Sequence, residues 1–414
     1  MKVKTRVQLS AMMFLQYFLW GAWWVTLGSY MVAIGFSDII GRTYATQGWG
    51  AIIAPLFVGM IADRYFSAQR VMGVLHLIGA GLLFYLSTIT DSRLEFYLTT
   101  LIYMATFMPT LPLSNTVAFN AMRDTQKEFP PIRVLGTIGW IVAGLALSFV
   151  LAPLVLAGDS AITIEQTVWP VRLAAGAALL LGLFAFTLPD APPSAAGTAP
   201  KGIAGILGLD VFRSGATRAF WVFIACSLLI CVPLAFYYGY TNAFLVDKGA
   251  PNAVALQSLG QVSEIVFMLI LPLMFVRLGI KYVLLVGMVA WAVRYVLFAL
   301  GYSGSEIILG LAVTGILLHG ICYDFFFVAG QIYVDKSLPK ETRGRAQSFL
   351  ALTTLGVGAL LGGELANAVV NANSADGTVD WRTVWLIPAA LSAAVTVAFL
   401  LLFRNAKAQQ NDSS

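Results

Sequence analysis

Long apolar blocks separated by short polar segments make up most of this chain. A run of about 20 mostly apolar residues is the length that an α-helix needs to cross the hydrocarbon core of a bilayer. We therefore predict an all-α polytopic membrane protein with twelve transmembrane helices. Their expected ranges are 7–35, 39–62, 70–90, 95–120, 132–157, 166–188, 217–246, 252–276, 281–302, 305–333, 344–372 and 382–403.

The longest polar interruption falls between the sixth and seventh apolar runs, and it is rich in Pro, Ala and Ser. It separates six helices from six. We therefore expect an N-terminal bundle over 1–189, a central loop over 190–216 and a C-terminal bundle over 217–414. Tight basic turns after the second and eighth runs suggest a weak internal repeat of the two halves.

Composition narrows the protein class further. The chain has 414 residues, of which 59% are hydrophobic and 11% are charged, whereas soluble proteins average about 25% charged residues. This excludes soluble, disordered and fibrous proteins. The net charge of +5 comes from short loops and not from one basic face, so it does not indicate nucleic-acid binding.

Basic residues are distributed unequally between the two sides of the expected membrane. Most Lys and Arg lie on the side of the N-terminus, which by the positive-inside rule is the cytoplasm. We therefore expect a multi-pass inner-membrane protein with both termini and the central loop in the cytoplasm. The opposite side holds only Arg42, Arg93, Arg172, Lys248 and Arg382.

Four charged residues remain inside the apolar runs: Arg133, Glu264, Arg294 and Asp324. A charge at the bilayer centre costs about 2.5–3.5 kcal/mol on insertion scales, so such residues are usually functional or paired. Arg294 has no assigned role here beyond that of a possible ion-pair partner.

The fifth run carries Arg133, Thr137 and Trp140 at positions i, i+4 and i+7, on one helical face. A cation, a hydroxyl and an indole in one stripe are suited to a polar solute that contains a ring. The alternative is that Arg133 lies at the cytoplasmic end and extends to the lipid headgroups.

The eighth run carries Gln261 and Glu264 on one face, with Glu264 near its middle. We interpret both as binding residues, although an ion pair that only fixes packing remains an alternative. In the tenth run, His319 and Tyr323 share a face and Asp324 follows directly, and we expect all three, with Tyr238 of the seventh run, among the substrate-binding residues. Asp324, with Glu264 as second choice, is the expected proton carrier; a structural role is the alternative.

The seventh run contains Pro233 and Gly239, which can interrupt a membrane helix beside a cavity. Tyr238 lies between them and offers a stacking face with a polar tip. The tyrosines here can equally belong to an interfacial belt, and the same holds for the W-G-A-W-W run that begins at Trp20.

The 6+6 pattern resembles the major facilitator superfamily, and more specific motifs resemble its nucleoside:proton symporter family over nearly the whole chain. The chain looks closer to the less characterised nucleoside-transporter branch of that family. The motifs are Q-Y-F-L-W-G-A-W from Gln16, M-P-T-L from Met108, F-P-P-I-R-V-L-G-T-I-G-W from Phe129, Q-V-S-E from Gln261, Y-D-F-F from Tyr323 and W-R-T-V-W-L from Trp381.

The resemblance implies that Arg133, Thr137 and Trp140 contact a nucleoside, that Gln261 and Glu264 bind ribose or base, and that Asp324 is essential. The chain departs from the family at Ala235 and Tyr238, where polar amides are expected, and at His319, where Tyr is expected. The superfamily's loop signature is partly present and implies a gating role; the alternative is that these residues only anchor the topology. The residues assigned to it are Gly59, Asp63, Arg64, Arg70, Arg277, Gly279 and Lys281.

These observations predict a proton-coupled symporter that imports nucleosides or related ribosides by alternating access. The alternative keeps the fold and the proton coupling but takes a sugar, glycoside or other metabolite. An enzyme or a sensor is disfavoured because there is no clustered catalytic set, metal-ligand spacing or appended soluble domain. We expect a monomer in the lipid bilayer, with no cofactor, no metal and the proton as coupling ion.

Overall fold

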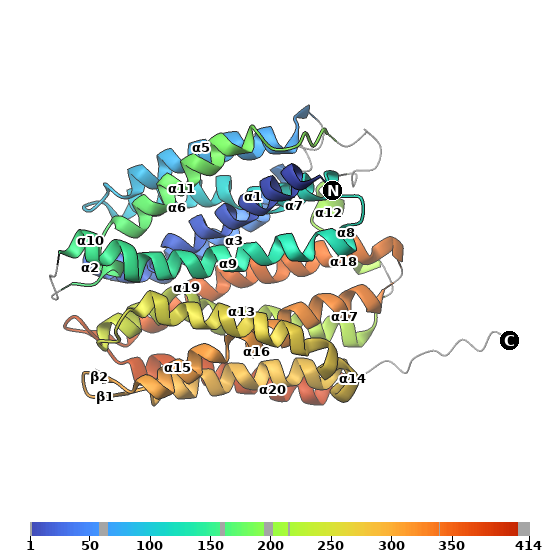
Figure 1. Cartoon of the computed structure of the whole chain (residues 1–414). Helices are drawn as coiled ribbons and strands as arrows, with labels where there is room; N and C mark the ends of the chain where they lie inside the picture. The colour runs from blue at the N-terminus through green and yellow to red at the C-terminus, as the bar shows by residue number, and fades with distance from the viewer. Residues whose placement is uncertain are drawn as a thin grey trace.

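The computed structural model describes residues 2–57, 65–157, 162–193, 202–213, 216–338 and 340–404. Long helices run side by side along one direction (Figure 1). The elements up to the central loop are α1 (Val3–Trp23), α2 (Leu27–Ala33), η1 (Ser37–Ile39), α3 (Ile40–Phe57), α5 (Ala68–Leu86), α6 (Arg93–Phe107), α7 (Thr110–Asn120), α8 (Thr125–Glu128), α9 (Pro130–Ala146), η3 (Leu147–Leu151), α10 (Ala152–Leu156), η4 (Ile164–Gln166) and α11 (Trp169–Ala185).

The helices from α13 to α20 gather on the other side of the molecule, drawn yellow to red in Figure 1. Among the η elements, η3, η6 and η7 are π-helical turns within longer helices. The elements are α12 (Gly202–Ile206), η5 (Leu209–Arg213), α13 (Arg218–Asp247), α14 (Ala253–Ala299), β1 (Tyr302–Ser303), β2 (Glu306–Ile307), α15 (Leu309–Leu317), α16 (His319–Tyr323), η6 (Asp324–Val328), α17 (Ala329–Ser337), α18 (Lys340–Ala351), η7 (Leu352–Gly358), α19 (Ala359–Ala372), β3 (Ser374–Ala375), β4 (Thr378–Val379) and α20 (Trp381–Leu402).

Eight of the described helical segments are long and apolar enough to cross a membrane. One of them, α14, consists of two spans joined at Gly279, whose backbone (φ 72°, ψ 165°) leaves the helical region. Together with α1–α2, α3 and α11, this makes twelve spans in the part of the chain that the structure describes. The predicted fold class is therefore confirmed, and the observed spans fall close to their predicted ranges.

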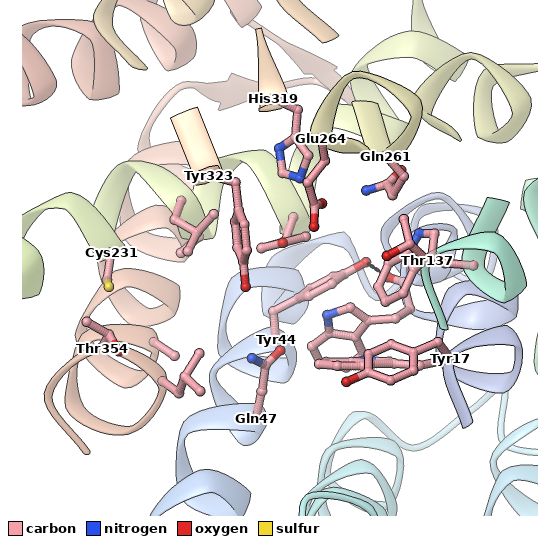
Figure 2. A pocket seen from close by; sticks show the side chains of 18 of the residues that line it. Tyr17, Tyr44, Gln47, Thr137, Cys231, Gln261, Glu264, His319, Tyr323 and Thr354 are labelled. Carbon is pink, nitrogen blue, oxygen red and sulfur yellow. Dashed lines mark hydrogen bonds between the residues drawn. The ribbon is translucent and has the colours of Figure 1, made fainter. Parts of the chain in front are cut away.

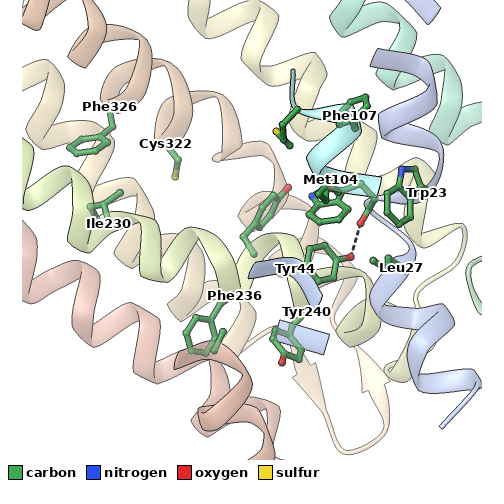
Figure 3. Packing of buried hydrophobic residues seen from close by; sticks show 14 of the residues in the cluster. Trp23, Leu27, Tyr44, Met104, Phe107, Ile230, Phe236, Tyr240, Cys322 and Phe326 are labelled. Atoms are coloured by element: carbon green, nitrogen blue, oxygen red, sulfur yellow. Dashed lines mark hydrogen bonds between the residues drawn. The ribbon is translucent and has the colours of Figure 1, made fainter. Parts of the chain in front are cut away.

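The first span is interrupted between α1 and α2, and a tyrosine from the second span bridges the interruption. The Tyr44 hydroxyl donates to the carbonyl of Trp24 (2.6 Å) and accepts from the amide of Gly28 (3.2 Å). Figure 3 shows Tyr44 packed beside Trp23 and Leu27. Irregular backbone at membrane depth is tolerated where protein groups satisfy it, so Tyr44 stabilises the interrupted helix.

The fourth span is interrupted between α6 and α7, where a buried polar network begins. The Thr110 hydroxyl donates to the Phe107 carbonyl (2.6 Å) and accepts from the Gln16 amide nitrogen (2.7 Å). The Gln16 amide oxygen therefore faces His76 Nε2, at 2.9 Å. Because that oxygen can only accept, His76 Nε2 carries a proton. All three polar side chains are buried.

Replacing Gln16 with Leu is expected to lower the melting temperature of the protein in detergent by several degrees. The change leaves the buried Thr110 and His76 without their partner, and each unsatisfied group costs about 1–3 kcal/mol. The matched control is Gln331→Leu, the same change at an exposed glutamine. Equal melting temperatures for the two variants would contradict the network.

The end of the molecule that carries the β1–β2 and β3–β4 hairpins is called the hairpin face (Figure 1, left). The opposite end, where α1 begins and α20 ends, is the terminal face. Toward the hairpin face the two helix sets touch through glycines. A Cβ atom on Gly41 would lie 2.4 Å from the Gly363 carbonyl, and one on Gly28 would lie 2.5 Å from the Gly239 carbonyl.

Polar contacts reinforce this closure. The Gly41 amide donates to Asn367 Oδ1 (3.0 Å), and Arg42 pairs with Glu364 (3.2 Å). Further along the same end, the Ser29 hydroxyl lies 2.5 Å from Asn242 Oδ1. The interior between the two helix sets is therefore closed toward the hairpin face.

Replacing Gly41 with Val is expected to open this closure, because any side chain there collides with the Gly363 backbone. A cysteine placed at the buried Ser29 should react with a maleimide at least about tenfold faster in the Gly41→Val background, a shift that corresponds to about 1.4 kcal/mol. Gly81→Val is the control, since a Cβ at Gly81 meets no atom within 4 Å. Equal labelling rates in both backgrounds would show that this contact does not hold the halves together.

Candidate functional site

A cavity lies between the two helix sets (Figure 2). The cavity has a volume of about 160 Å³, measured as the space that the centres of water molecules can reach. Both sets contribute lining residues, so relative movement of the sets would change the cavity. The lining residues are Tyr17, Trp20, Trp24, Tyr44, Gln47, Arg133, Thr137, Trp140, Cys231, Leu234, Ala235, Tyr238, Gln261, Glu264, His319, Tyr323, Thr354, Leu355, Ala359 and Gly363.

The predicted stripe on α9 faces this cavity. Arg133, Thr137 and Trp140 all line it, and the Arg133 guanidinium lies over the Tyr17 ring, 4.3 Å from its centroid. A guanidinium over an aromatic face is a favourable cation–π contact. This contact orients Arg133 along the cavity wall and leaves its N–H donors available.

Two glycines on α9 explain how the stripe comes so close to α1. A Cβ atom on Gly139 would lie 2.2 Å from the Phe14 carbonyl, and one on Gly136 would lie 2.6 Å from the Tyr17 ring. Only glycine permits this approach of the two helices. The G-T-I-G segment therefore positions Arg133 over Tyr17.

Gln261 and Glu264 line the cavity from α14, one helical turn apart (Figure 2). Arg133, from the other helix set, is the cation whose charge acts on Glu264. Within the described residues, neither the Glu264 carboxylate nor the Gln261 amide has a hydrogen-bond partner. A ligand between the two helix sets can therefore accept from Arg133 and donate to Glu264, and charge-assisted hydrogen bonds are the stronger kind.

His319 and Tyr323 on α16, with Tyr238 on α13, complete the polar side of the cavity. The His319 ring stacks on Tyr237 with 5.0 Å between centroids and 16° between planes. Its Nδ1 atom has no hydrogen-bond partner among the described residues. The ring is thus held by stacking, and its polar edge is left without a partner.

Arg294 lies behind this stack. It is fully buried, and its guanidinium lies 4.2 Å from the Tyr237 centroid and 4.8 Å from that of Trp291. None of its three nitrogens has a hydrogen-bond partner among the described residues. Arg294 therefore supports the ring layer on which His319 rests, a contact that the sequence did not indicate.

Asp324 does not reach the cavity. Its side chain is fully buried, and both carboxylate oxygens have no partner in the described part of the chain. Its neighbour Tyr323 lines the cavity, and a one-residue step turns a helix by about 100°. Glu264 is the charged group that acts on Asp324. The structure thus separates Asp324 from the other eight predicted binding residues, all of which line the cavity.

Aromatic residues of the first two spans line one side of the cavity. The sequence left open whether they line a site or form an interfacial belt. Trp20 packs edge-on against Trp140 (5.4 Å between centroids), and Trp24 packs on Tyr44 (4.6 Å). The W-G-A-W-W run was the available signal, but aromatic runs are also common at the membrane interface. Tyr44 gave no such signal, because its position depends on the interruption of another helix.

The predicted gating residues are dispersed. Gly59, Asp63 and Arg64 lie outside the described residues. Gly279 forms the turn within α14, and the Lys281 ammonium donates to the Leu400 carbonyl (3.2 Å) near the end of α20. These contacts join neighbouring helices at the terminal face, and the gating role itself stays a prediction.

Arg70, near the start of α5, lies close to Asp190, which follows the sixth span. Hydrogen bonds from Gln69 and Ser67, together with the nearby Arg70 charge, lower the pKa of Asp190. The Gln69 amide nitrogen lies 2.5 Å from Asp190 Oδ1. The start of α5 is therefore joined to the segment that follows α11. Arg277, the last member of the predicted set, is exposed.

Comparison with known proteins gives one family. A family model described as nucleoside H⁺ symporter matches residues 1–408. YegT of Escherichia coli is 42% identical over 409 residues, covering 97% of this chain and 94% of the relative. The nucleoside permease NupG of Escherichia coli is 34% identical over 415 residues, covering 96% of each chain.

Comparison with solved structures leads to the same family. The crystal structure of the nucleoside transporter NupG matches with a TM-score of 0.85 and 34% identity, over 98% of this chain and 100% of that one. The POT family transporter PepTSo matches with a TM-score of 0.74 at 14% identity, over 97% of this chain and 98% of that one. The second likeness shows the shared fold alone.

Proposed function

The chain belongs to the nucleoside H⁺ symporter family, and on this basis we propose that it imports nucleosides with protons, binding them in the central cavity. It is a multi-pass membrane transporter and not an enzyme. The cavity is the binding site, and the proton is the coupling ion.

One observation supports the site most strongly. Hydrogen-bonding groups without protein partners, on Arg133 and Thr137 from one helix set and Gln261 and Glu264 from the other, face a cavity with an aromatic wall. A nucleoside combines a flat ring that stacks with hydroxyls and ring nitrogens that hydrogen-bond. A bound nucleoside would contact both helix sets and so favour their approach to one another.

The transport cycle that we propose is a rocking of two bundles, 1–189 and 217–414, about this cavity. Positive-inside asymmetry supports an orientation with both termini in the cytoplasm of an inner membrane. In that orientation the closed hairpin face is periplasmic, so entry to the cavity from the periplasm requires the contacts of that face to separate. The protein works as a monomer, because one chain contains the whole site.

Proton coupling requires a group that takes up a proton when the site faces one side of the membrane and releases it when the site faces the other. Asp324 is the first choice and Glu264 the second, since both are carboxyls inside the spans. One charge moved through about 100 mV is worth about 2.3 kcal/mol, and one pH unit adds about 1.4 kcal/mol. One proton per nucleoside therefore supports roughly tens-fold to several hundred-fold accumulation.

The function is tested by nucleoside uptake into proteoliposomes. Radiolabelled uridine and adenosine should accumulate inside when an inward proton gradient is imposed. When the gradient is collapsed with an ionophore, they should only equilibrate. Uptake that is indifferent to the gradient would contradict the proton coupling. Failure of every nucleoside to enter or compete would leave another metabolite, such as a sugar or glycoside, as the substrate.

A further inference from the structure

A buried carboxylate outside the cavity joins the two helix sets at the hairpin face. Glu165 lies in η4, which follows α10 and packs against α2, and Figure 1 shows both α10 and α2 at this face. The residue is only 2% exposed. Its carboxylate accepts a hydrogen bond from the Val254 amide (2.9 Å), in the first turn of α14. The contact therefore links the first helix set to the helix that carries Gln261 and Glu264.

The start of α14 has no cap of its own. The first amides of an α-helix lack partners within the helix, and a side chain of the residue before the helix usually accepts from one of them. Here that residue is Asn252, which has a left-handed backbone (φ 49°) and makes no such bond. The first turn also contains no acidic residue that would balance the helix dipole. Glu165 provides both the acceptor and the negative charge from the other helix set.

The Val254 side chain makes a second contact at the same point. It packs with Val25, Leu147 and Ile164 in a small apolar cluster that is separate from the main core, and all four side chains are buried. The other three belong to the first helix set, and Ile164 directly precedes Glu165. The beginning of α14 is thus held by a hydrogen bond and by apolar packing against the same turn.

Both partners of the hydrogen bond are held in position. The Gln166 side chain accepts from the Thr163 amide (2.9 Å) and so fixes the turn around Glu165. On the other side, α9 approaches α14 closely, since a Cβ atom on Gly144 would lie 2.3 Å from the Ser258 hydroxyl oxygen. The cap therefore forms where the two helix sets are in direct contact.

We propose that Glu165 is a latch that holds the periplasmic side of the transporter closed by capping α14 across the two bundles. The proposal rests on the proposed function, in which the hairpin face is periplasmic and the bundles rock. Separation of the bundles at this face breaks the cap and exposes the carboxylate and the α14 amides to water. Water can satisfy both, so release leaves no buried polar group unsatisfied. Loss of the carboxylate should therefore shift the equilibrium toward the open face.

The test measures maleimide labelling of purified protein that carries Ser29→Cys, a buried position at the hairpin face. Glu165→Ala is expected to speed this labelling at least about fivefold. Glu165→Gln keeps an acceptor for the Val254 amide but loses the charge, so its rate should lie between those of wild type and Glu165→Ala. Glu306→Ala removes an exposed carboxylate of the β1–β2 hairpin at the same face and should leave the rate within about twofold of wild type.

Native Cys322 distinguishes opening of the face from general loosening of the protein. It is fully buried and does not line the cavity, so its labelling, resolved by mass spectrometry, should stay unchanged. Equal labelling of position 29 in Glu165→Ala and Glu306→Ala, or an equal acceleration at Cys322, would overturn the latch. If Glu165→Ala does not fold, Glu165→Gln is compared with Glu306→Gln by the same criteria. No readout here requires a nucleoside, so failure of the latch leaves the proposed function intact, and failure of wild-type uptake leaves the labelling result intact.

Discussion

Asp324→Asn is expected to abolish gradient-driven accumulation of nucleoside while leaving nucleoside binding nearly unchanged. The amide cannot take up or release a proton, so accumulation should fall from tens-fold or more to simple equilibration. The Asp324 side chain is fully buried and does not line the cavity, so the binding contacts persist. Accumulation in proteoliposomes and calorimetric binding to the purified variant give the two readouts.

Glu264→Gln is the matched control, because it makes the same carboxyl-to-amide change on a residue that lines the cavity. It is expected to weaken binding, which Asp324→Asn should not. A loss of binding in Asp324→Asn, with an unchanged melting temperature, would contradict the separation of the two roles. If accumulation survives in Asp324→Asn, Asp324 is not the proton carrier.

The fold was predictable because membrane insertion imposes a simple pattern. A helix in lipid needs about 20 apolar residues, and the twelve blocks meet that requirement. The interruptions were not predictable in the same way. The one after Trp23 depends on the Tyr44 hydroxyl from another span. The one before Thr110 falls at Pro109, which has no backbone N–H to donate, and Gln16 and His76 satisfy the polar side chains there. The contacts of Tyr44, Gln16 and His76 are tertiary contacts that no local pattern encodes.

The residues of the site likewise divide into those that the sequence could identify and those that it could not. Arg133 and Glu264 were identifiable because a charge within a membrane helix is costly and rare. The apolar residues that line the cavity could not be identified, since Leu234 and Leu355 resemble residues that face lipid. The burial of Asp324 behind Tyr323 also could not be inferred, because adjacent residues on a helix differ by about 100° in direction and the sequence does not fix where the cavity lies.

Both helix sets must contribute to ligand affinity if binding is to drive their movement together. We expect Arg133 to contribute most from the first set, because it is the charged residue of that set that lines the cavity. Arg133→Ala is therefore expected to raise the dissociation constant for nucleoside roughly 10- to 150-fold, because a hydrogen bond to a charged group is worth about 1.5–3 kcal/mol. Calorimetric titration of the purified variant measures the change directly.

Two further variants distinguish ligand binding from a purely topological role of Arg133. Arg172→Ala removes an arginine that also lies over an aromatic ring, that of Trp169 (5.6 Å), but outside the cavity, and it should leave binding unchanged. Arg133→Lys keeps the charge but loses the planar fork of donors, so its affinity should fall between wild type and Arg133→Ala. If Arg133 only reached toward lipid headgroups, Lys would replace it fully and Ala would change stability without changing affinity.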